Sequence, residues 1–406
     1  MSRPQMIAAL GIVTAGISSA IWIYLLAMRG GFWRCREREE RPSARPDPVC
    51  WPSVVAVIPA RNEADILPAS LGSVLRQDYP GPFSVILVDD NSADGTSAVA
   101  GAVGAGAANR LAIVAGAALP AGWTGKLWAL HQGIEAARSK APDYLLLTDA
   151  DIAYEPQALR RLVRRAEAEG RVLVSLMAKL RCASRAEQLL IPAFIFFFQK
   201  LYPFTWVNLP HKRTAAAAGG CMLVRRSALE AAGGIASIRG ALIDDCTLGA
   251  TMKRVGPIWL GLANGVHSLR AYPVFSDIRA MVTRSAYAQL HYSPWLLGGT
   301  VVGMMLTYLA APALAVWGSG VTRTVALATW VMMSASFLPT LRYYGASPLW
   351  SPALPAIAAI YLGFTVESAW QHARGRGGMW KGRAQARRTG IAPTMHSDDA
   401  RERPDR

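Results

Sequence analysis

The hydrophobic pattern divides the chain into long apolar runs near its two ends and short apolar runs between them. The long runs lie at 6–28, 295–317, 325–340 and 349–370. Runs of about 20 apolar residues can cross a bilayer as helices, whereas short runs that alternate with helical segments are typical of buried strands. The pattern therefore predicts an α/β domain with transmembrane helices on both sides of it.

The central part shows candidate strands separated by helical segments, at 53–58, 84–88, 111–114, 144–148 and 171–177. This alternation predicts a mostly parallel sheet, which binds ligands at the carboxyl ends of its strands. Asp89 and Asp90 follow the second strand, and Asp149 and Asp151 follow the fourth. We therefore expect two groups of acids at the same edge of the sheet.

The acids Asp149 and Asp151 suit a divalent metal ion. They are separated only by Ala150, and carboxylate oxygens are ligands that Mg²⁺ and Mn²⁺ prefer. Such an ion would neutralise a diphosphate, and the turn at 89–90 would accept hydrogen bonds from a base or ribose. An acidic turn that binds nothing is the alternative. A glycine-rich dinucleotide fingerprint and a P-loop are both absent, which argues against hydride transfer and against P-loop ATP hydrolysis.

Composition places this domain beside a membrane. The chain has 406 residues, of which 52% are hydrophobic, and its formal net charge is +16. The basic residues stand next to the apolar runs, a distribution that favours an anionic membrane leaflet and argues against nucleic acid as a partner. The five cysteines show neither metal-binding nor disulfide spacing, so we expect them to be reduced and to face the cytosol.

The charges around the first apolar run set the expected orientation. Only Arg3 precedes this run, whereas several arginines follow it from Arg29 onward. This bias puts the amino terminus outside and the central domain in the cytosol, in a multi-pass protein of the bacterial inner membrane. The expected divisions are 1–30 (transmembrane anchor), 31–52 (basic, proline-rich linker), 53–290 (central domain), 291–372 (carboxyl-terminal transmembrane helices) and 373–406 (basic tail, expected to be disordered).

Two points of membrane topology stay open. Residues 189–210 are apolar and aromatic but short and broken by Pro203, which predicts a helix in the membrane interface, with a buried core helix as the alternative. Three spans after a cytosolic domain would leave the basic tail outside, against the charge rule. Either 325–340 fails to cross or 189–198 crosses.

Four motifs in the central domain resemble a known family. Residues 57–63, 88–96, 149–151 and 244–245 read Val-Ile-Pro-Ala-Arg-Asn-Glu, Val-Asp-Asp-Asn-Ser-Ala-Asp-Gly-Thr, Asp-Ala-Asp and Asp-Asp. In this order they resemble the motifs of family 2 glycosyltransferases of the GT-A fold. Segments 122–129, 196–208 and 218–222 resemble more narrowly the hopene-associated glycosyltransferases, with ceramide glucosyltransferases as more distant relatives.

The resemblance implies a role for individual residues. It places Pro59, Arg61, Glu63 and Asp90 in the nucleoside pocket, Asp149 and Asp151 at the donor and its metal, Lys126 at the donor diphosphate, and Gly219, Gly220 and Cys221 beside the acceptor. It makes Asp245 the general base, with Asp244 as the second candidate because the family has Glu at that position. From the residues alone, the alternatives are that Lys126 is a surface lysine that snorkels and that both aspartates at 244–245 only complement a helix dipole.

One departure from the family concerns processive synthesis, the repeated addition of sugars to a growing polymer. Processive members carry Gln-x-x-Arg-Trp after the base, and this chain has Arg284 with no tryptophan behind it. Arg284 either contacts the diphosphate or belongs to the basic face of an interfacial helix. The resemblance thus implies a non-processive, inverting transfer from a nucleotide-sugar donor to a membrane lipid acceptor of the hopanoid type. Transfer to a polyprenyl phosphate or a sphingolipid, and a non-catalytic membrane scaffold, are the alternatives.

Overall fold

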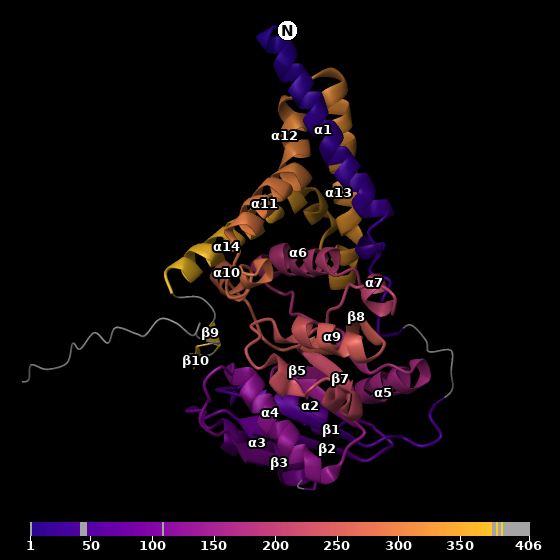
Figure 1. Cartoon of the computed structure of the whole chain (residues 1–406), viewed down its shortest axis with the longest axis vertical. Helices are drawn as coiled ribbons and strands as arrows, with labels where there is room; N and C mark the ends of the chain where they lie inside the picture. The colour runs from indigo at the N-terminus through magenta and orange to yellow at the C-terminus, as the bar shows by residue number, and fades with distance from the viewer. Residues whose placement is uncertain (1, 41–46, 108, 376–378, 381–382, 385–406) are drawn as a thin grey trace, which may run out of the picture.

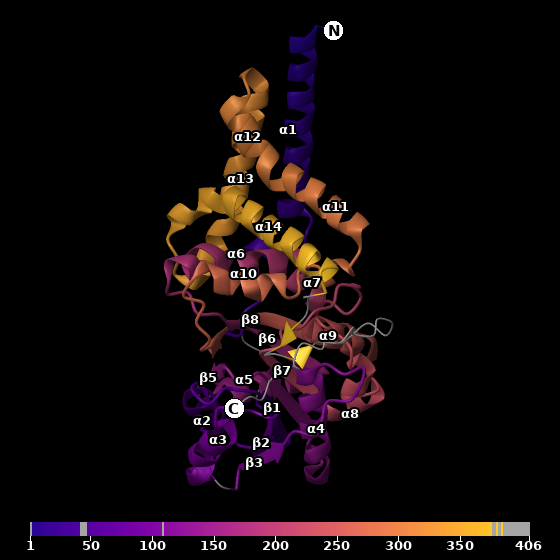
Figure 2. The same cartoon turned by 90° about the vertical axis from the view of Figure 1, so that its left-hand side faces the viewer.

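The molecule is elongated, with an α/β domain at one end and a bundle of long helices at the other (Figures 1 and 2). The computed structural model describes residues 2–40, 47–107, 109–375, 379–380 and 383–384. The amino terminus lies at the tip of the bundle that is far from the α/β domain. The predicted linker falls partly, and the predicted tail mostly, outside the described residues.

In the described residues, eight strands form one mixed sheet in the order β3-β2-β1-β4-β7-β6-β8-β5. The strands are β1 (Val54–Ala60), β2 (Phe83–Asp89), β3 (Leu111–Ala115), β4 (Tyr144–Thr148), β5 (Ile152–Tyr154), β6 (Leu173–Lys179), β7 (Cys221–Arg225) and β8 (Ile258–Ser268). The five predicted strands are confirmed as β1 to β4 and β6. The sheet is less parallel than predicted, because β7 runs antiparallel between β4 and β6. A short pair, β9 (Met379–Trp380) and β10 (Arg383–Ala384), forms a second sheet.

The apolar runs form strands because both faces of the sheet are covered. All seven residues of β1 and all five of β4 are buried, and side chains of a strand point alternately to the two faces. Val54, Ala56 and Ile58 pack in the same core as α2 (Leu67–Leu75) and α5 (Ala158–Glu169). Val55 and Val57 pack in a second core with α4 (Gly125–Ala137) and the bundle.

Shorter helices complete the domain: α3 (Thr96–Gly104), α8 (Arg226–Ala231) and α9 (Asp244–Val255). α9 is the helix whose dipole the two aspartates at 244–245 were expected to complement. Neither aspartate caps it, because the residue at the cap position is Ile243, which makes no side-chain hydrogen bond there. Asp244 and Asp245 both lie in the first turn, where their side chains project toward the edge of the sheet.

Four stretches within the described residues are long and apolar enough to cross a membrane: 5–27, 294–317, 320–344 and 348–373. The first is α1 (Arg3–Ala27). The second consists of α11 (Pro294–Met304), a π-helical turn η6 (Met305–Leu309) and α12 (Ala310–Trp317), the third is α13 (Gly320–Tyr344), and the fourth is η7 (Pro348–Ala353) followed by α14 (Leu354–Ala373). The span predicted at 325–340 therefore extends at both ends.

The segment predicted to lie in the interface forms α6 (Arg185–Leu201) and α7 (Phe204–Asn208). Figures 1 and 2 show α6 across the base of the bundle, between the bundle and the α/β domain, together with α10 (Phe275–Thr283). Phe196 is fully buried and its ring contacts Phe32 and Phe337 of the bundle side. Protein covers both sides of α6, as expected of a buried core helix. Its place at the base of the bundle is the one expected of a helix in the membrane interface.

Part of the predicted linker is docked on the domain. Arg38 forms a parallel bridge with Leu262 of β8. The buried Glu39 accepts hydrogen bonds from the backbone of Asn264 and Gly265, at 3.0 and 2.9 Å, and pairs with Arg161 at 2.7 Å. Arg38 and Glu39 of the predicted linker therefore belong structurally to the domain.

Candidate active site

The carboxyl ends of β1, β2 and β4 and the start of α9 meet at the edge of the sheet that faces the bundle. This edge collects nearly all of the predicted site residues, because parallel strands end on the same side. Two ionic clusters form there. Lys126 is the centre of the first and Arg270 is the centre of the second.

Lys126, in the first turn of α4, bridges acids from two other elements. Its Nζ lies 2.8 Å from Oδ1 of Asp149 and 3.1 Å from Oδ2 of Asp244. Only 14% of the lysine side chain is exposed, so it does not snorkel from a surface turn. Burial lowers the pKa of Lys126, but the charges of Asp149 and Asp244 outweigh this effect and raise it overall. The ammonium group therefore stays protonated.

Asp245 lies next to this cluster and is held by backbone amides. Its Oδ2 accepts a hydrogen bond from the amide of Gly219 at 3.0 Å, and its Oδ1 accepts one from Cys246 at 2.7 Å. Burial and then the charge of Asp244 raise the pKa of Asp245, and Lys126 opposes both, so that the pKa is raised to about 6. A carboxylate with a pKa near 6 is ionised at neutral pH yet basic enough to accept a proton.

The Gly219 position permits this close approach. A Cβ atom there would lie 3.1 Å from Nζ of Lys126 and 3.5 Å from Oδ2 of Asp245, so any side chain would displace the lysine. The expected close backbone approach at 219–220 thus occurs against Lys126 and Asp245. Cys221 is fully buried in β7, so its thiol does not line the open edge.

Burial also acts on Asp149. It raises the pKa of Asp149, which the charge of Lys126 lowers and the charge of Asp151 raises again. Asp149 is thus a carboxylate whose charge depends on a neighbouring cation. A bound metal ion would be a second cation of this kind, in addition to Lys126.

Arg270 forms the second cluster. Its Nε donates to Oδ2 of Asp151 at 3.0 Å, and its second nitrogen pairs with Oε1 of Glu63 at 2.8 Å. Ser268 also donates to Oδ2 of Asp151, at 3.2 Å. Sequence reasoning missed Arg270, because β8, which delivers it to this edge, was not predicted as a strand. A cation two residues after a strand would have been the signal.

The turns after β1 and β2 clamp each other at the expected nucleoside side. Asn62 and Asn91 have positive φ angles of 50° and 53°, a conformation that Asn tolerates. Oδ1 of Asn62 accepts from the amide of Ala93 at 2.9 Å, and Oδ2 of Asp94 accepts from Ala64 at 3.0 Å. The residues of 88–96 therefore fix the shape of both turns.

The remaining predicted residues lie in several parts of the structure. Pro59 is buried within β1. Arg61 lies 3.8 Å from the fully buried carboxylate of Asp90 and donates to the backbone oxygens of Asp90 and Asn91. Gly220 packs against Ile152. Arg284 is exposed at the end of α10.

The carboxylates of 149 and 151 are suitable donors for a hard metal ion. Their contacts with Lys126 and Arg270 use one oxygen of each group. No group of three or more His, Cys, Asp or Glu side chains is arranged for a metal ion in the part of the chain that the structure describes. An ion at this edge would therefore be held by Asp149 or Asp151 together with substrate oxygens, which is a common arrangement for Mg²⁺.

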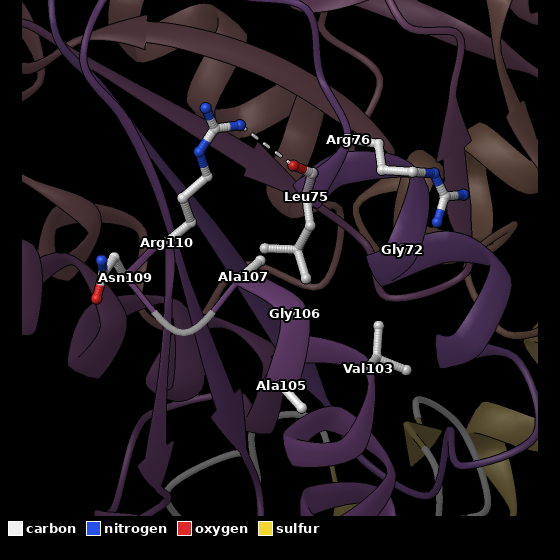
Figure 3. A pocket seen from close by; sticks show the side chains of 9 residues that line it. All are labelled: Gly72, Leu75, Arg76, Val103, Ala105, Gly106, Ala107, Asn109 and Arg110. Atoms are coloured by element: carbon white, nitrogen blue, oxygen red, sulfur yellow. Dashed lines mark hydrogen bonds between the residues drawn. The ribbon is translucent and has the colours of Figure 1, made fainter.

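A cavity lies elsewhere in the α/β domain. It has a volume of about 820 Å³ and is lined by Arg76, Arg110 and small residues of α2, α3 and the turn before β3 (Figure 3). Arg110 donates to the backbone oxygen of Leu75 there. Because this cavity lies at the start of β3, it is at the opposite edge of the sheet from the acids.

Comparisons of sequence with known proteins concern mainly residues 55–233 of this domain. Residues 55–233 match the family model for Glycosyl transferase family 2. The chain is 34% identical over 157 residues to the succinoglycan biosynthesis protein ExoO of Rhizobium meliloti (strain 1021), which covers 36% of this chain and 42% of that protein. It is 30% identical over 197 residues to an N-acetylglucosaminyltransferase of Mesorhizobium japonicum (strain LMG 29417 / CECT 9101 / MAFF 303099), with 46% and 42% covered. The chain thus spans less than half the length of these relatives.

A solved structure resembles a larger part of the chain. The mannosyltransferase PcManGT from Pyrobaculum calidifontis, in complex with GDP-Man and Mn²⁺, superposes with a TM-score of 0.50 and 20% sequence identity. The superposition covers 85% of this chain and 98% of the other. This likeness shows the fold, a GT-A-like mixed sheet flanked by helices, with apolar helices at the amino terminus and in the carboxyl-terminal region.

Proposed function

We propose that this protein transfers a sugar from a nucleotide-diphosphate donor to a membrane lipid alcohol, with inversion of configuration; the match of residues 55–233 to the model for Glycosyl transferase family 2 supports the transfer. The observation that carries the proposal is Asp245, a half-buried carboxylate beside the Lys126 cluster that is held by two backbone amides and has a pKa raised to about 6. General bases are tuned in this way.

The proposed reaction is a single displacement. Asp245 accepts the proton of the acceptor hydroxyl as that oxygen attacks the anomeric carbon, and the nucleotide diphosphate leaves on the opposite side. The amides of Gly219 and Cys246 hold the Asp245 carboxylate in a fixed orientation. Asp244 is already paired with Lys126, which favours Asp245 over Asp244 as the base.

A divalent ion completes the proposed donor site. Asp149 and Asp151 would hold Mg²⁺ or Mn²⁺, and the ion would neutralise the charge of the donor diphosphate. Lys126 keeps Asp149 and Asp244 from repelling each other, and Arg270 does the same for Asp151 and Glu63. The nucleoside would lie by the clamped turns, near Pro59, Arg61, Glu63 and Asp90. Arg284 would contact the diphosphate.

The acceptor is proposed to be a lipid because of where the acids lie. The edge that carries them faces α6, α10 and the apolar helices (Figures 1 and 2). An acceptor could therefore reach Asp245 from the bilayer, past Gly219 and Gly220, while its apolar body stays out of water. The hopanoid class and the non-processive mode rest on the motif resemblance, including the missing tryptophan after Arg284.

We also propose an orientation and a division of the chain. The proposed division gives 1–30 to the anchor, 31–52 to the linker, 53–290 to the catalytic domain, 291–372 to the carboxyl-terminal helices and 373–406 to the tail. The four apolar stretches support membrane association. The arginines that follow α1 favour the cytosolic side of the bacterial inner membrane for the catalytic domain.

The test is transfer of radiolabelled sugar from a panel of nucleotide sugars into extractable lipid. Membranes would contain the unaltered protein, Asp245→Asn, or the control Asp65→Asn, whose aspartate is exposed on the turn after β1. Each would be assayed with and without Mn²⁺. We expect label in a hopanoid fraction only with metal and with Asp245 intact.

Other results of this assay would change the proposal. Label in polyprenyl phosphate or in a sphingolipid would keep glycosyl transfer and replace the acceptor. Equal labelling by the Asp245→Asn variant would remove Asp245 as the base. Absence of label with every donor and acceptor, from folded protein, would favour a non-catalytic scaffold.

A further inference from the structure

A second cavity lies at the junction of the domain and the bundle. Its volume is about 450 Å³, and it is lined by Lys179 at the end of β6, Arg181, His267 and Ser268 at the end of β8, and Tyr344 at the end of α13. We call it the Lys179 cavity. Ser268 also donates to Asp151, so the cavity adjoins the acid-bearing edge.

The walls of the Lys179 cavity carry nitrogen donors and lack a counterion. Lys179 and His267 are paired across neighbouring strands, and Arg181 follows two residues after Lys179. None of the three forms an ion pair within the described residues, and no carboxylate is among the lining side chains. Lys179 and Arg181 are both cations, so an anion beside them is favoured.

Tyr344 gives a second, independent observation. Only 8% of this residue is exposed, and its hydroxyl has no hydrogen-bond partner among the described residues. Buried hydroxyl groups are nearly always hydrogen-bonded, because an unpaired one loses its contacts with water. An oxygen-rich ligand in the cavity would accept this hydrogen bond.

The depth of the cavity indicates which anion it meets. Tyr344 is the last residue of α13, a helix of 25 residues that is long enough to span a bilayer. Tyrosines and basic residues at the end of a spanning helix lie at the level of the lipid headgroups. At that level the prevailing anion is a phosphate ester.

We propose that the Lys179 cavity binds the phosphate group of a membrane lipid. The guanidinium of Arg181 and the ammonium of Lys179 would contact phosphate oxygens, as such groups commonly do, and Tyr344 would donate its free hydroxyl. The phosphate belongs either to a phospholipid of the leaflet or to a phosphorylated polyprenyl lipid. The proposal concerns binding alone and does not depend on glycosyl transfer.

The experiment uses the full chain in a maltoside detergent that contains no phosphate. Its melting temperature is recorded while one of four additives is titrated: phosphatidylglycerol, a polyprenyl phosphate, diacylglycerol or inorganic phosphate. A ligand that binds the folded state raises the melting temperature according to its affinity. We expect one or both of the lipid phosphates to stabilise the protein, and diacylglycerol not to.

Variants assign the effect to the cavity. Lys179→Gln and Arg181→Gln should each weaken lipid binding about tenfold, since a charge-assisted hydrogen bond is lost. Arg76→Gln makes the same change of charge in the cavity of Figure 3 and should have no effect. Tyr344→Phe should leave the melting temperature without lipid unchanged or raised, because it removes an unpaired hydroxyl, and should still weaken lipid binding.

The additives separate the two sources of phosphate. Stabilisation by phosphatidylglycerol identifies a phospholipid site, and stabilisation by the polyprenyl phosphate alone identifies a site for a phosphorylated acceptor. Stabilisation by inorganic phosphate alone would overturn the assignment to a lipid. Equal lipid binding by the unaltered protein and by both cavity variants would overturn the site itself.

Discussion

At the scale of single residues, the raised pKa of Asp245 makes a prediction about pH. Burial and then the charge of Asp244 raise this pKa, to about 6. A general base must be ionised, so activity should rise with pH and level off above about pH 6. The measurement is kcat/KM from pH 5 to 8 with saturating metal. A profile with no limb between pH 5 and 7 would contradict the role.

Lys126 should move this limb. Its charge lowers the pKa of Asp245, so Lys126→Met should shift the limb upward by about one pH unit, equivalent to about 1.4 kcal/mol. Loss of a cation beside the donor should also reduce kcat about 10²-fold or more. Lys126→Arg keeps the charge and should retain most of the low-pH activity. A limb that stays in place in the Met variant would mean that Lys126 acts only as a structural link.

The strand ends explain which site residues the sequence could reveal. Asp149 and Asp151 follow an uninterrupted apolar strand, so their place at the edge follows from local pattern alone. The bridge from Lys126 to Asp244 joins residues far apart in the chain, which no local pattern predicts. Arg270 was missed for the same reason.

At the scale of elements, the two clamped turns should govern donor binding. Asp94 accepts hydrogen bonds from the backbone of Ala64 and Thr96, each at 3.0 Å. Asp94→Ala should cost about 1–2 kcal/mol of stability and raise KM for the donor more than it lowers kcat. Thermal unfolding and steady-state kinetics measure these effects. Asp65→Ala, which removes an exposed aspartate from the turn after β1, is the control, and equal effects in both variants would contradict the clamp.

Elements that depend on local pattern were predicted, and those that depend on distant partners were not. The runs at β1 and β4 are apolar throughout and bounded by turns. By contrast, β8 contains Gly261, Asn264 and Gly265, which are unfavourable in strands. It forms because β6 and β5 pair with it and because Glu39 accepts two of its amides.

At the scale of the whole molecule, the path of α14 bears on the conflict between span count and charge. η7, just before α14, contacts the middle of α13: Ser351 donates to the backbone oxygen of Ser334 at 2.5 Å, and Trp330 donates to Pro352 at 3.1 Å. The other end of α14 contacts α10, where Glu367 pairs with Arg279 at 2.8 Å. α14 therefore extends along only about half of α13.

This geometry offers a third solution, which neither expected reading contained. α13 keeps its full length of 25 residues, and α6 lies across the base of the bundle (Figure 1). If α14 enters the membrane halfway and returns, α1, the α11–α12 segment and α13 make three crossings. The end of α14 is then on the side of the catalytic domain, as the charge rule requires of the basic residues behind it.

Thiol labelling would locate both ends of the bundle. The exposed Cys50 of the α/β side is a built-in reference, and Arg374→Cys and Arg323→Cys place a thiol at the end of α14 and at the start of α13. With an impermeant maleimide on sealed vesicles of known orientation, the thiol at 374 should react from the same side as Cys50, and the thiol at 323 from the other side. Reaction of the thiol at 374 together with that at 323 would mean that α14 crosses completely, because a half-entering helix must bring its two ends back to one face.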